Sequence, residues 1–381
     1  MDPHKLLIVG ISIGLTVIIL IISAIIPFKD SIHWYIYAKL LRLEHALRPL
    51  PPGINNIVLV TIDNNTLNTM TEKWPYPRAC FYTVIDNLKK AGARAIGFDF
   101  VFYGNSTEEE KELLKKVIGN DKNIVLGAGI DDAGRLSTST TSELKSMVRS
   151  GLVTKLEDSD GEIRKCPTYF VKHHESKRAF LSWELLLMKA AGELDINSIE
   201  SQERNLSFEK LSGKSCSIPV EKDTKAFLIH YRANTTDFNR ISFASVFKNN
   251  FNPRLVKDKI IIVGLASQLL QDIHNTPFGW LPGVTLNANT FLNVYSCDFL
   301  KEIPMAAQIF VIFLSTLLLT FVRIFFKKHI FVILLALAQI LIFFIASYTL
   351  LTCGYVWNYF LFPFVIIFMS LICGKFPLTY Y

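Results

Sequence analysis

Four long apolar runs constrain what this chain can fold into more than any other feature of its sequence. The first, Leu6 to Ile26, has 21 residues and not one charged side chain. The others lie at about 305–322, 330–351 and 356–373. A bilayer core of roughly 30 Å needs about 20 apolar residues in a helix, and at this length only a helix satisfies its own backbone in lipid. The sequence therefore predicts four membrane-spanning helices.

The first run has an alternative interpretation as a cleaved secretory signal. Its apolar stretch exceeds the roughly 7–15 residues usual in a signal peptide, and no clean small-x-small cleavage site follows it. These two features favour a permanent anchor over residues 1–27, with a second domain over 28–304 and a three-helix membrane bundle over 305–381.

The basic residues that flank the apolar runs predict one orientation for all four. Lys5, the turn from Arg323 to Lys328, and Lys375 would lie in the cytoplasm, because short cytoplasmic flanks are rich in Lys and Arg. The uncharged turn from Thr352 to Tyr355 would lie outside. The sequence thus predicts a multi-pass protein of the plasma (inner) membrane, in contact with the lipid bilayer, whose residues 28–304 are extracytoplasmic.

Almost all charged residues lie in this middle segment, where acidic and basic side chains are nearly balanced. The net charge of the 381-residue chain is +7, and no Asp or Glu follows Glu302. No clustered Lys/Arg stripe with interleaved aromatic residues is present, so the charge does not indicate a nucleic-acid partner.

Buried strands alternate with helices along the middle segment. Apolar β-branched runs predict strands at 57–62, 95–102, 123–130 and 259–264, and helices are expected at 77–92, 107–119 and 282–300. This alternation predicts an α/β domain, a mainly parallel sheet with helices on both faces. The long connection between 130 and 259 carries hairpin-like pieces at 158–165, a helix at 182–191 and an edge strand at 226–231.

A helix is also expected directly after the first membrane span. One apolar stripe recurs at helical spacing along this segment: Ile32, Ile36, Leu40, Leu43 and Leu47. Such a helix could form a signalling stalk or a dimer seam, or it could pack on its own domain; two heptads do not decide between these.

The cysteines of the middle segment indicate no metal site. Cys80, Cys166, Cys216 and Cys297 form no C-x-x-C pair and show no metal-ligand spacing. An oxidising compartment permits disulfides, but sequence cannot pair them, and buried free thiols are the default expectation.

Short segments of the middle region, taken in order, resemble the type-2 CHASE domain, an extracellular sensor domain associated with cyclases and histidine kinases. They are Val60-Thr61-Ile62-Asp63, Trp74-Pro75-Tyr76-Pro77-Arg78, Gly97-Phe98-Asp99-Phe100-Val101-Phe102, Asp160-Gly161 with Arg164, Lys259-Ile260-Ile261-Ile262-Val263-Gly264, Asp272, Thr276-Pro277-Phe278 and Pro282-Gly283-Val284. The resemblance covers about residues 30–300, and three closing membrane spans are the family's usual layout.

Two departures from the family pattern matter for function. Thr285-Leu286-Asn287 stands where relatives usually have an acid and a histidine, so a ligand contact at that place does not carry over. Relatives also continue into a cytoplasmic output module, whereas this chain stops eight residues after Cys373. The resemblance therefore implies a sensor subunit that acts through a separate cytoplasmic kinase or cyclase, or through a second copy of itself, in response to a small molecule or protein signal.

Candidate ligand-binding residues follow from the predicted sheet. Asp63 and Asp99 stand at the carboxyl ends of two strands that we expect to be neighbours, and ligands of open α/β sheets bind at that edge. Paired carboxylates there could hold a metal ion or a cationic ligand; alternatively they cap loops and pair with Arg78 or Arg94. Trp74 and Arg78 flank the same edge, where Arg78 could bind a carboxylate or phosphate or could simply neutralise an aspartate.

Three further motifs are weaker. Asp272-Ile273-His274 has the residue types of a metal or pH-sensitive element, and Asp272 completes the set of candidate ligand residues. His173-His174 lies in a basic segment typical of a solvated loop. Gly127-Ala128-Gly129 lacks phosphate-loop spacing, which favours close backbone packing.

Two other classes of function compete with the sensor hypothesis. An adaptor would bind another envelope protein and no small ligand. An extracytoplasmic enzyme would need convergent titratable groups, and the sequence offers no nucleophile or acid/base partner beside the aspartates. We therefore expect no catalytic residues, no metal centre and no cofactor.

Overall fold

The computed structural model describes residues 3–102, 107–118, 122–130, 136–137, 149–171, 179–326 and 328–375. The chain divides into two compact units, one made of residues 1–47 and 300–381 and one made of residues 48–299. His173-His174, Gly119 and Lys327 lie outside the described residues, as does the side chain of Lys375.

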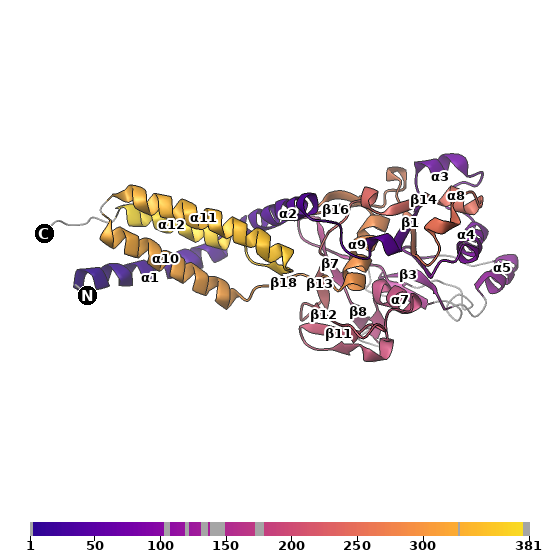
Figure 1. Cartoon of the computed structure of the whole chain (residues 1–381), viewed down its shortest axis with the longest axis horizontal. Coiled ribbons are helices and arrows are strands. Elements are labelled where there is room, and N and C mark those ends of the chain that lie inside the picture. Colours follow the sequence, from indigo (N-terminus) through magenta and orange to yellow (C-terminus); the bar gives the residue numbers. More distant parts are fainter. Residues whose placement is uncertain are drawn as a thin grey trace. The chain divides into compact units, whose positions relative to one another are not determined.

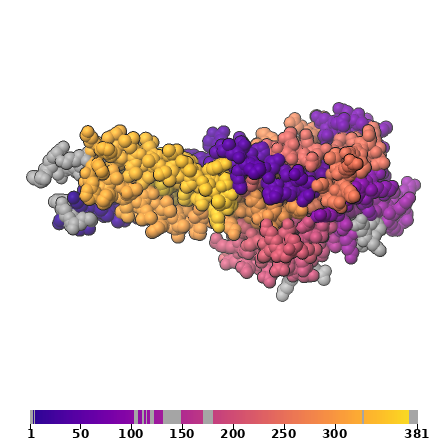
Figure 2. Space-filling view, in the orientation of Figure 1, coloured from indigo at the N-terminus to yellow at the C-terminus, as the bar shows by residue number. Residues whose placement is uncertain are grey.

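The first unit is helical (Figure 1). Its elements are α1 (Pro3–Ile25), α2 (Lys29–Leu47), β18 (Lys301–Glu302), α10 (Met305–Phe325), α11 (His329–Thr352), β19 (Tyr355–Val356) and α12 (Leu361–Lys375). Helix α12 packs against α1, α10 and α11, so the first and last segments of the chain lie side by side in this unit (Figure 2).

Three of these helices are long and apolar enough to cross a membrane: Lys5–Ile25, Met305–Phe325 and His329–Thr352. The predicted fourth span does not begin near 356 as expected. Tyr355 and Val356 instead pair with Lys301 and Glu302 as short parallel strands. The Asn358 side chain then accepts the N–H groups of Phe360 and Leu361, each at 3.0 Å, which starts α12 only at Leu361.

Helix α12 is consequently short for a span. Its apolar part covers Leu361–Ile372, and 15 helical residues rise about 22 Å, less than the roughly 30 Å of a bilayer core.

Helix α2 does not pack through the predicted stripe. Of the stripe residues only Leu40 is buried; Ile32, Leu43 and Leu47 are exposed. The fully buried side chains of α2 are instead Tyr37 and Leu41, and the helix packs on α11.

The second unit is built on a seven-stranded sheet of order β14-β1-β15-β2-β3-β4, with β5 beside β3 (Figure 1). Its strands are β1 (Ile57–Ile62), β2 (Ala95–Phe98), β3 (Ile124–Ile130), β4 (Leu136–Ser137), β5 (Arg149–Leu152), β14 (Asn239–Ser242) and β15 (Ile260–Leu265). All neighbours pair in parallel except β3 and β4. The predicted parallel α/β core is therefore confirmed.

Helices cover both faces of this sheet. They are α3 (Asn64–Thr69), α4 (Arg78–Lys90), α5 (Glu108–Ile118), α7 (Trp183–Ala190), α8 (Phe243–Phe247) and α9 (Gly283–Ser296). Helices α4 and α8 share one core with the strand residues that include Val58, Val60 and Val263. Helices α7 and α9 pack on the sheet as well, and α7 comes so close that a methyl group on Gly97 would overlap the Trp183 ring.

Smaller antiparallel pieces fill the long connection and precede α9. They are β6 (Leu156–Glu157) with β7 (Ile163–Pro167) and β13 (Ala226–Leu228), β8 (Tyr169–Val171) with β9 (Ala179–Leu181), β10 (Glu200–Ser201) with β11 (Asn205–Glu209) and β12 (Ser215–Pro219), and β16 (Ile273–Thr276) with β17 (Gly279–Pro282). The predicted hairpin and the edge strand at 226 both occur here.

Two expectations about the central strands are wrong. The strand predicted over 95–102 ends at Phe98, because the backbone of Phe100 passes over Gly127, where a Cβ atom would come within 2.8 Å of the Phe100 carbonyl oxygen. Strands β1 and β2 are not neighbours, because β15 pairs with both of them. The close approach at Gly127 agrees with the packing interpretation of its glycine-rich segment.

Candidate functional site

Asp99 is buried at the carboxyl end of β2, beside the end of β15. Its carboxylate occupies the space over Gly264 of β15, where a methyl group would overlap it. Asp99 is only 8% exposed, and in the part of the chain that the structure describes its carboxylate oxygens have no partner at full hydrogen-bonding distance; the Asn287 side chain is the polar group that approaches it. An unpartnered buried carboxylate costs free energy, so this position requires an explanation.

Asp272 lies at the start of α9, on the same edge of the sheet. Its backbone oxygen accepts the Gly283 N–H at 3.0 Å, and its carboxylate occupies the space where a Gly283 side chain would stand. The Asp272 Oδ1 atom is 2.9 Å from His274 Nε2. The negative charge of Asp272 contributes to the raised pKa of Asp99.

The surroundings of Asp99 disfavour its charged form. Burial raises the pKa of Asp99 well above its ordinary value, and the negative charge of Asp272 raises it further. A hydrogen bond from the Asn287 side chain, the positive charge of Lys155 and a backbone hydrogen bond offset only part of this rise in the pKa. The Oδ1 atom of Asn287, on α9, is itself buried without a partner.

Lys155, whose charge also acts on Asp99, makes its direct contacts elsewhere. Lys155 Nζ donates to Glu184 Oε1 at 2.9 Å and to the Val153 carbonyl at 3.0 Å, with both ionic side chains almost fully buried. Burial alone would lower the pKa of Lys155, but Cys166 and Glu184 hold it above its ordinary value. Lys155 therefore stays charged, and its direct ion pair is with Glu184.

The other candidate residues, Asp63, Trp74 and Arg78, have separate local surroundings. Asp63 caps α3 by accepting the Thr66 N–H at 2.8 Å, and Trp74 packs edge-on against Tyr76. Burial is the main reason that the pKa of Tyr76 is raised, and the charges of Cys80, Glu72 and Asp63 add to it. Arg78 is buried at the start of α4. With β15 between β1 and β2, Asp63 and Asp99 follow strands that are not neighbours in the sheet.

Helix α9 connects the Asp99 site to the place where the chain leaves the second unit. Every residue of α9 from Gly283 to Val294 is buried. The Asn293 side chain makes two hydrogen bonds of 2.9 Å to the backbone of His230. Its Oδ1 accepts the His230 N–H, and its Nδ2 donates to the His230 carbonyl. The Asn289 side chain binds the backbone in a similar way: it accepts the N–H groups of Arg232 and Ala233 and donates to the Ala233 carbonyl. These asparagines were missed from the sequence, although polar amides in an otherwise apolar helix are the signal that could have found them.

The two chain crossings between the units start from one polar cluster, which we call the exit cluster: Pro49, His230, Arg232 and Asp298. Arg232 donates to the Pro49 carbonyl at 3.2 Å and contacts Asp298 at 3.4 Å, and His230 Nδ1 lies 3.0 Å from Asp298. Burial would raise the pKa of Asp298, but its hydrogen bond with His230 and the positive charges of His230 and Arg232 lower it below the ordinary value.

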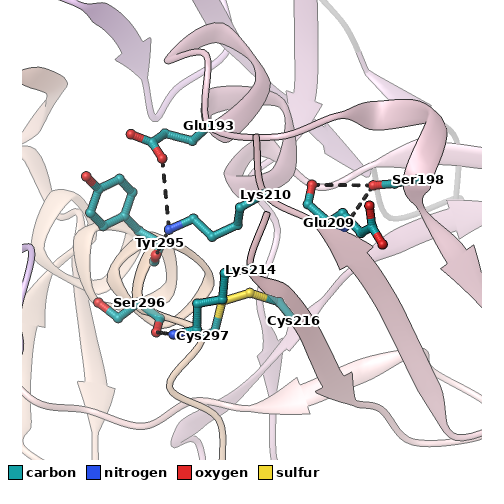
Figure 3. The surroundings of a disulfide bond; sticks show 9 residues. All are labelled: Glu193, Ser198, Glu209, Lys210, Lys214, Cys216, Tyr295, Ser296 and Cys297. Carbon is teal, nitrogen blue, oxygen red and sulfur yellow. Dashed lines mark hydrogen bonds and ion pairs between the residues drawn. A yellow bond between two sulfur atoms is a disulfide. The ribbon is translucent and has the colours of Figure 1, made fainter. Parts of the chain in front are cut away.

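A disulfide joins Cys216 of β12 to Cys297 at the end of α9 (Figure 3). The expectation of free thiols is therefore wrong for this pair, because the fold brings together cysteines 81 positions apart in the chain. Beside it Lys210 donates to the Tyr295 carbonyl at 2.9 Å, and Lys214 reaches that of Ser296 at 3.5 Å. Cys80 and Cys166 are free and buried, as expected.

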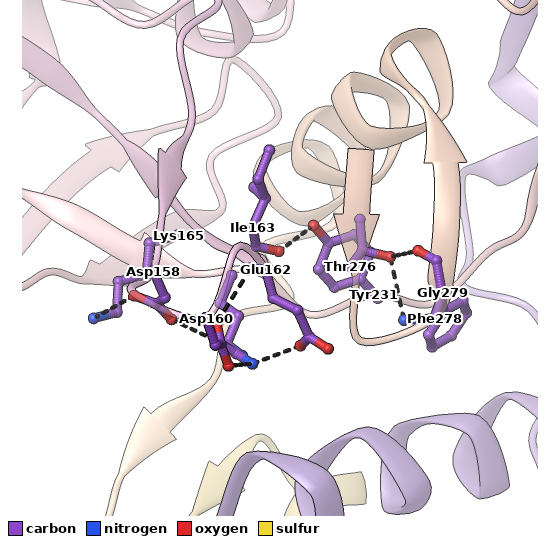
Figure 4. Close-up of polar contacts among 10 residues, drawn as sticks. Asp158, Asp160, Glu162, Ile163, Lys165, Tyr231, Thr276, Phe278 and Gly279 are labelled. Carbon is purple, nitrogen blue, oxygen red and sulfur yellow. Dashed lines mark hydrogen bonds and ion pairs between the residues drawn. The ribbon is translucent and has the colours of Figure 1, made fainter. Parts of the chain in front are cut away.

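The Asp160-Gly161 segment with Arg164 has an internal structural role (Figure 4). Buried Arg164 binds the carboxylates of Asp158, Asp160 and Glu162 at 2.6–2.8 Å. The Tyr231 hydroxyl donates to the Ile163 carbonyl at 2.7 Å, which ties this hairpin to the strand leading to the exit cluster.

The comparisons with known proteins identify the family. No curated protein and no solved structure matches the chain. The family model of the CHASE2 domain matches residues 13–324, which is most of the chain. CHASE2 domains are extracytoplasmic sensor domains, and the three apolar helices agree with a membrane protein. The chain belongs to the CHASE2 domain family.

Proposed function

We propose that this protein is a multi-pass sensor subunit of the plasma (inner) membrane. Its extracytoplasmic domain binds a signal at the edge of the sheet that holds Asp99 and Asp272, while Asp63, Trp74 and Arg78 support the sheet nearby. The signal passes to the membrane helices, with α12 completing the crossing as a short fourth span. A separate cytoplasmic kinase or cyclase, or a second copy of the chain, supplies the output.

One observation carries this proposal: buried helix α9 begins beside Asp272 and ends at the exit cluster. Its 14 residues rise about 21 Å as a single rigid element. A ligand that changes the position of the Gly283 end would also displace Asn293 and Asp298, which hold the two chain crossings. A ligand shifts such an equilibrium only through unequal affinity for two arrangements, and a ligand that pairs with the buried Asp99 carboxyl in only one of them would meet this condition.

The disulfide and the charged flanks support the extracytoplasmic location of the domain. Disulfides persist in oxidising compartments and are rare in the cytosol. Lys5 and Arg323 lie at the ends of α1 and α10 that the orientation rule assigns to the cytoplasm.

Cysteine labelling of intact cells tests this location. Ser212, in an exposed turn, is changed to cysteine in a Cys353→Ser background, because Cys353 is itself exposed. A membrane-impermeant maleimide should label Ser212→Cys in intact cells and Lys328→Cys only after permeabilisation. The reverse pattern would refute the orientation and with it the receptor function.

A further inference from the structure

His33 links helix α2 to the segment between α11 and α12, residues 353–360, which we call the α11–α12 connection. The backbone N–H of Tyr359 donates to His33 Nδ1 at 3.2 Å, and the two rings stack with their centroids 5.3 Å apart. Tyr359 is fully buried and His33 is half-buried. Helix α2 therefore has a direct polar contact with this connection.

The α11–α12 connection is also bound to both helices beside it. Trp357 Nε1 donates to Ser347 Oγ of α11 at 2.7 Å. The Asn358 N–H donates to Gln308 Oε1 of α10 at 2.9 Å. Through Tyr359, helix α2 is thus joined to a segment that α10 and α11 hold in place.

The hydrogen bond from Tyr359 requires the neutral form of His33. A backbone N–H only donates, so Nδ1 accepts through its lone pair and the proton of the neutral ring is on Nε2. In the protonated ring both nitrogens carry a hydrogen. The Nδ1–H group would then face the Tyr359 N–H, so protonation breaks the bond and leaves a buried donor without its acceptor.

The membrane helices bring no charged side chain to this end of the described bundle. Helix α10 carries Arg323 in its last turn, α11 begins at His329, and α12 has Lys375 at its last position. All three residues belong to the helix ends away from the α11–α12 connection.

The titratable groups around His33 come from α2, from β18 and from the connection itself. They are Lys29, Asp30, Tyr37, Glu44, Lys301, Glu302 and Tyr359. Asp30, Lys301 and Glu302 are exposed, and Lys29 donates to the Ala24 carbonyl. Glu44 lies about three turns further along α2, where its charge acts on Tyr359. The imidazole of His33 is the group whose ordinary titration lies between about pH 5 and 8.

We propose that His33 is a pH-sensitive latch: the neutral ring fastens α2 to the α11–α12 connection, and protonation releases it. The latch goes beyond the ligand response described above, because protons act on the segment that transmits the signal and not at the sheet edge. Acidification uncouples α2, which leads to the first chain crossing, from the helices that follow in the membrane.

Hydrogen–deuterium exchange of the full-length protein in lipid nanodiscs tests the proposal. The measured quantity is the protection of the Tyr359 amide, corrected for the intrinsic exchange rate, at about pH 5 and at about pH 8. We expect protection to be about tenfold lower at the acidic pH, because the bond that holds this amide is lost.

Three variants assign the change to His33. His33→Asn places an amide oxygen near the position of Nδ1 and does not titrate, so protection should stay high at both pH values. His33→Phe keeps a ring for stacking but has no acceptor, so protection should be low at both. His45→Asn is the matched control, since it removes another histidine of α2 and should keep the pH step of the wild type.

Four results would overturn the inference: equal protection of the wild type at both pH values, a pH step retained in His33→Asn, full protection in His33→Phe, or loss of the step in His45→Asn. A step retained in His33→Asn would assign the pH response to another group, with Glu44 the first to test. Nanodiscs expose both membrane faces, so none of these results depends on the orientation that cysteine labelling tests.

Discussion

The hydrogen bonds between Asn289 of α9 and the backbone of Arg232 and Ala233, which we call the clamp, allow a direct test of the fold. Asn289 is fully buried and makes four hydrogen bonds through one amide group. Its Oδ1 accepts the N–H groups of Arg232 and Ala233 at 3.0 and 3.1 Å. Its Nδ2 donates to the carbonyls of Ala233 and Thr285 at 2.8 and 3.0 Å. Asn289→Ala removes all four.

The expected loss follows from the groups left without partners. Two backbone N–H groups and the Ala233 carbonyl lose their hydrogen bonds to the Asn289 amide. Each buried polar group left unsatisfied lowers the free energy of unfolding by about 1–3 kcal/mol. Because local relaxation and water recover part of this, we expect a loss of about 3–5 kcal/mol. For a unit of this size 1 kcal/mol shifts the Tm by about 2–4 °C, so the Tm should fall by roughly 10 °C.

Two measurements on the full-length protein in nanodiscs check this prediction. Thermal unfolding gives the change in Tm, and hydrogen–deuterium exchange should show lost protection at residues 229–233. The control is Asn250→Ala, an exposed asparagine whose replacement should change stability by less than about 0.5 kcal/mol. A loss of under 1 kcal/mol for Asn289→Ala, or unchanged exchange at 229–233, would refute the clamp.

Three further predictions concern separate features. Cys216→Ser removes the disulfide and should cost about 2–5 kcal/mol, seen as a lower Tm that reducing agent no longer affects. Gly97→Ala forces a methyl group into the Trp183 ring and should cost about 1–3 kcal/mol in thermal unfolding, whereas a normal Tm would contradict this packing. The lowered pKa of Asp298, bonded to His230, stabilises the fold above the ordinary carboxyl pKa and is lost as pH falls through the folded value. Asp298→Asn should thus lower Tm at neutral pH and converge with wild type in acid.

The central strands were predictable because burial on both faces leaves a continuous apolar signature. The runs over 57–62 and 259–264 are such sequences, and β1 and β15 match them within a residue. The position of β15 between β1 and β2 was not predictable. Strand β15 enters the sheet between β1 and β2 from a segment more than 160 residues further along the chain, and no local pattern encodes that insertion.

The candidate site was predictable only in part for a similar reason. Asp99 and Asp272 follow from their place at loop ends near the sheet edge, where ligands of such folds bind. Asn287, Lys155 and Glu184 come from two helices and a loop, so their convergence depends on tertiary packing. The length of α12 depended on local chemistry instead, since one asparagine decides where an apolar segment becomes helical.

The two-residue pairing of β18 with β19 has a mechanical consequence for the membrane helices. Lys301 N–H donates to the Gly354 carbonyl at 2.8 Å and Ile303 N–H to that of Val356 at 2.7 Å, so the entry to α10 is fastened to the α11–α12 connection. A displacement that arrives along the chain at Leu300 cannot tilt α10 alone; it is shared with both following helices. Helices α10, α11 and α12 are therefore coupled at this end, and a change in the position of one is resisted by the other two.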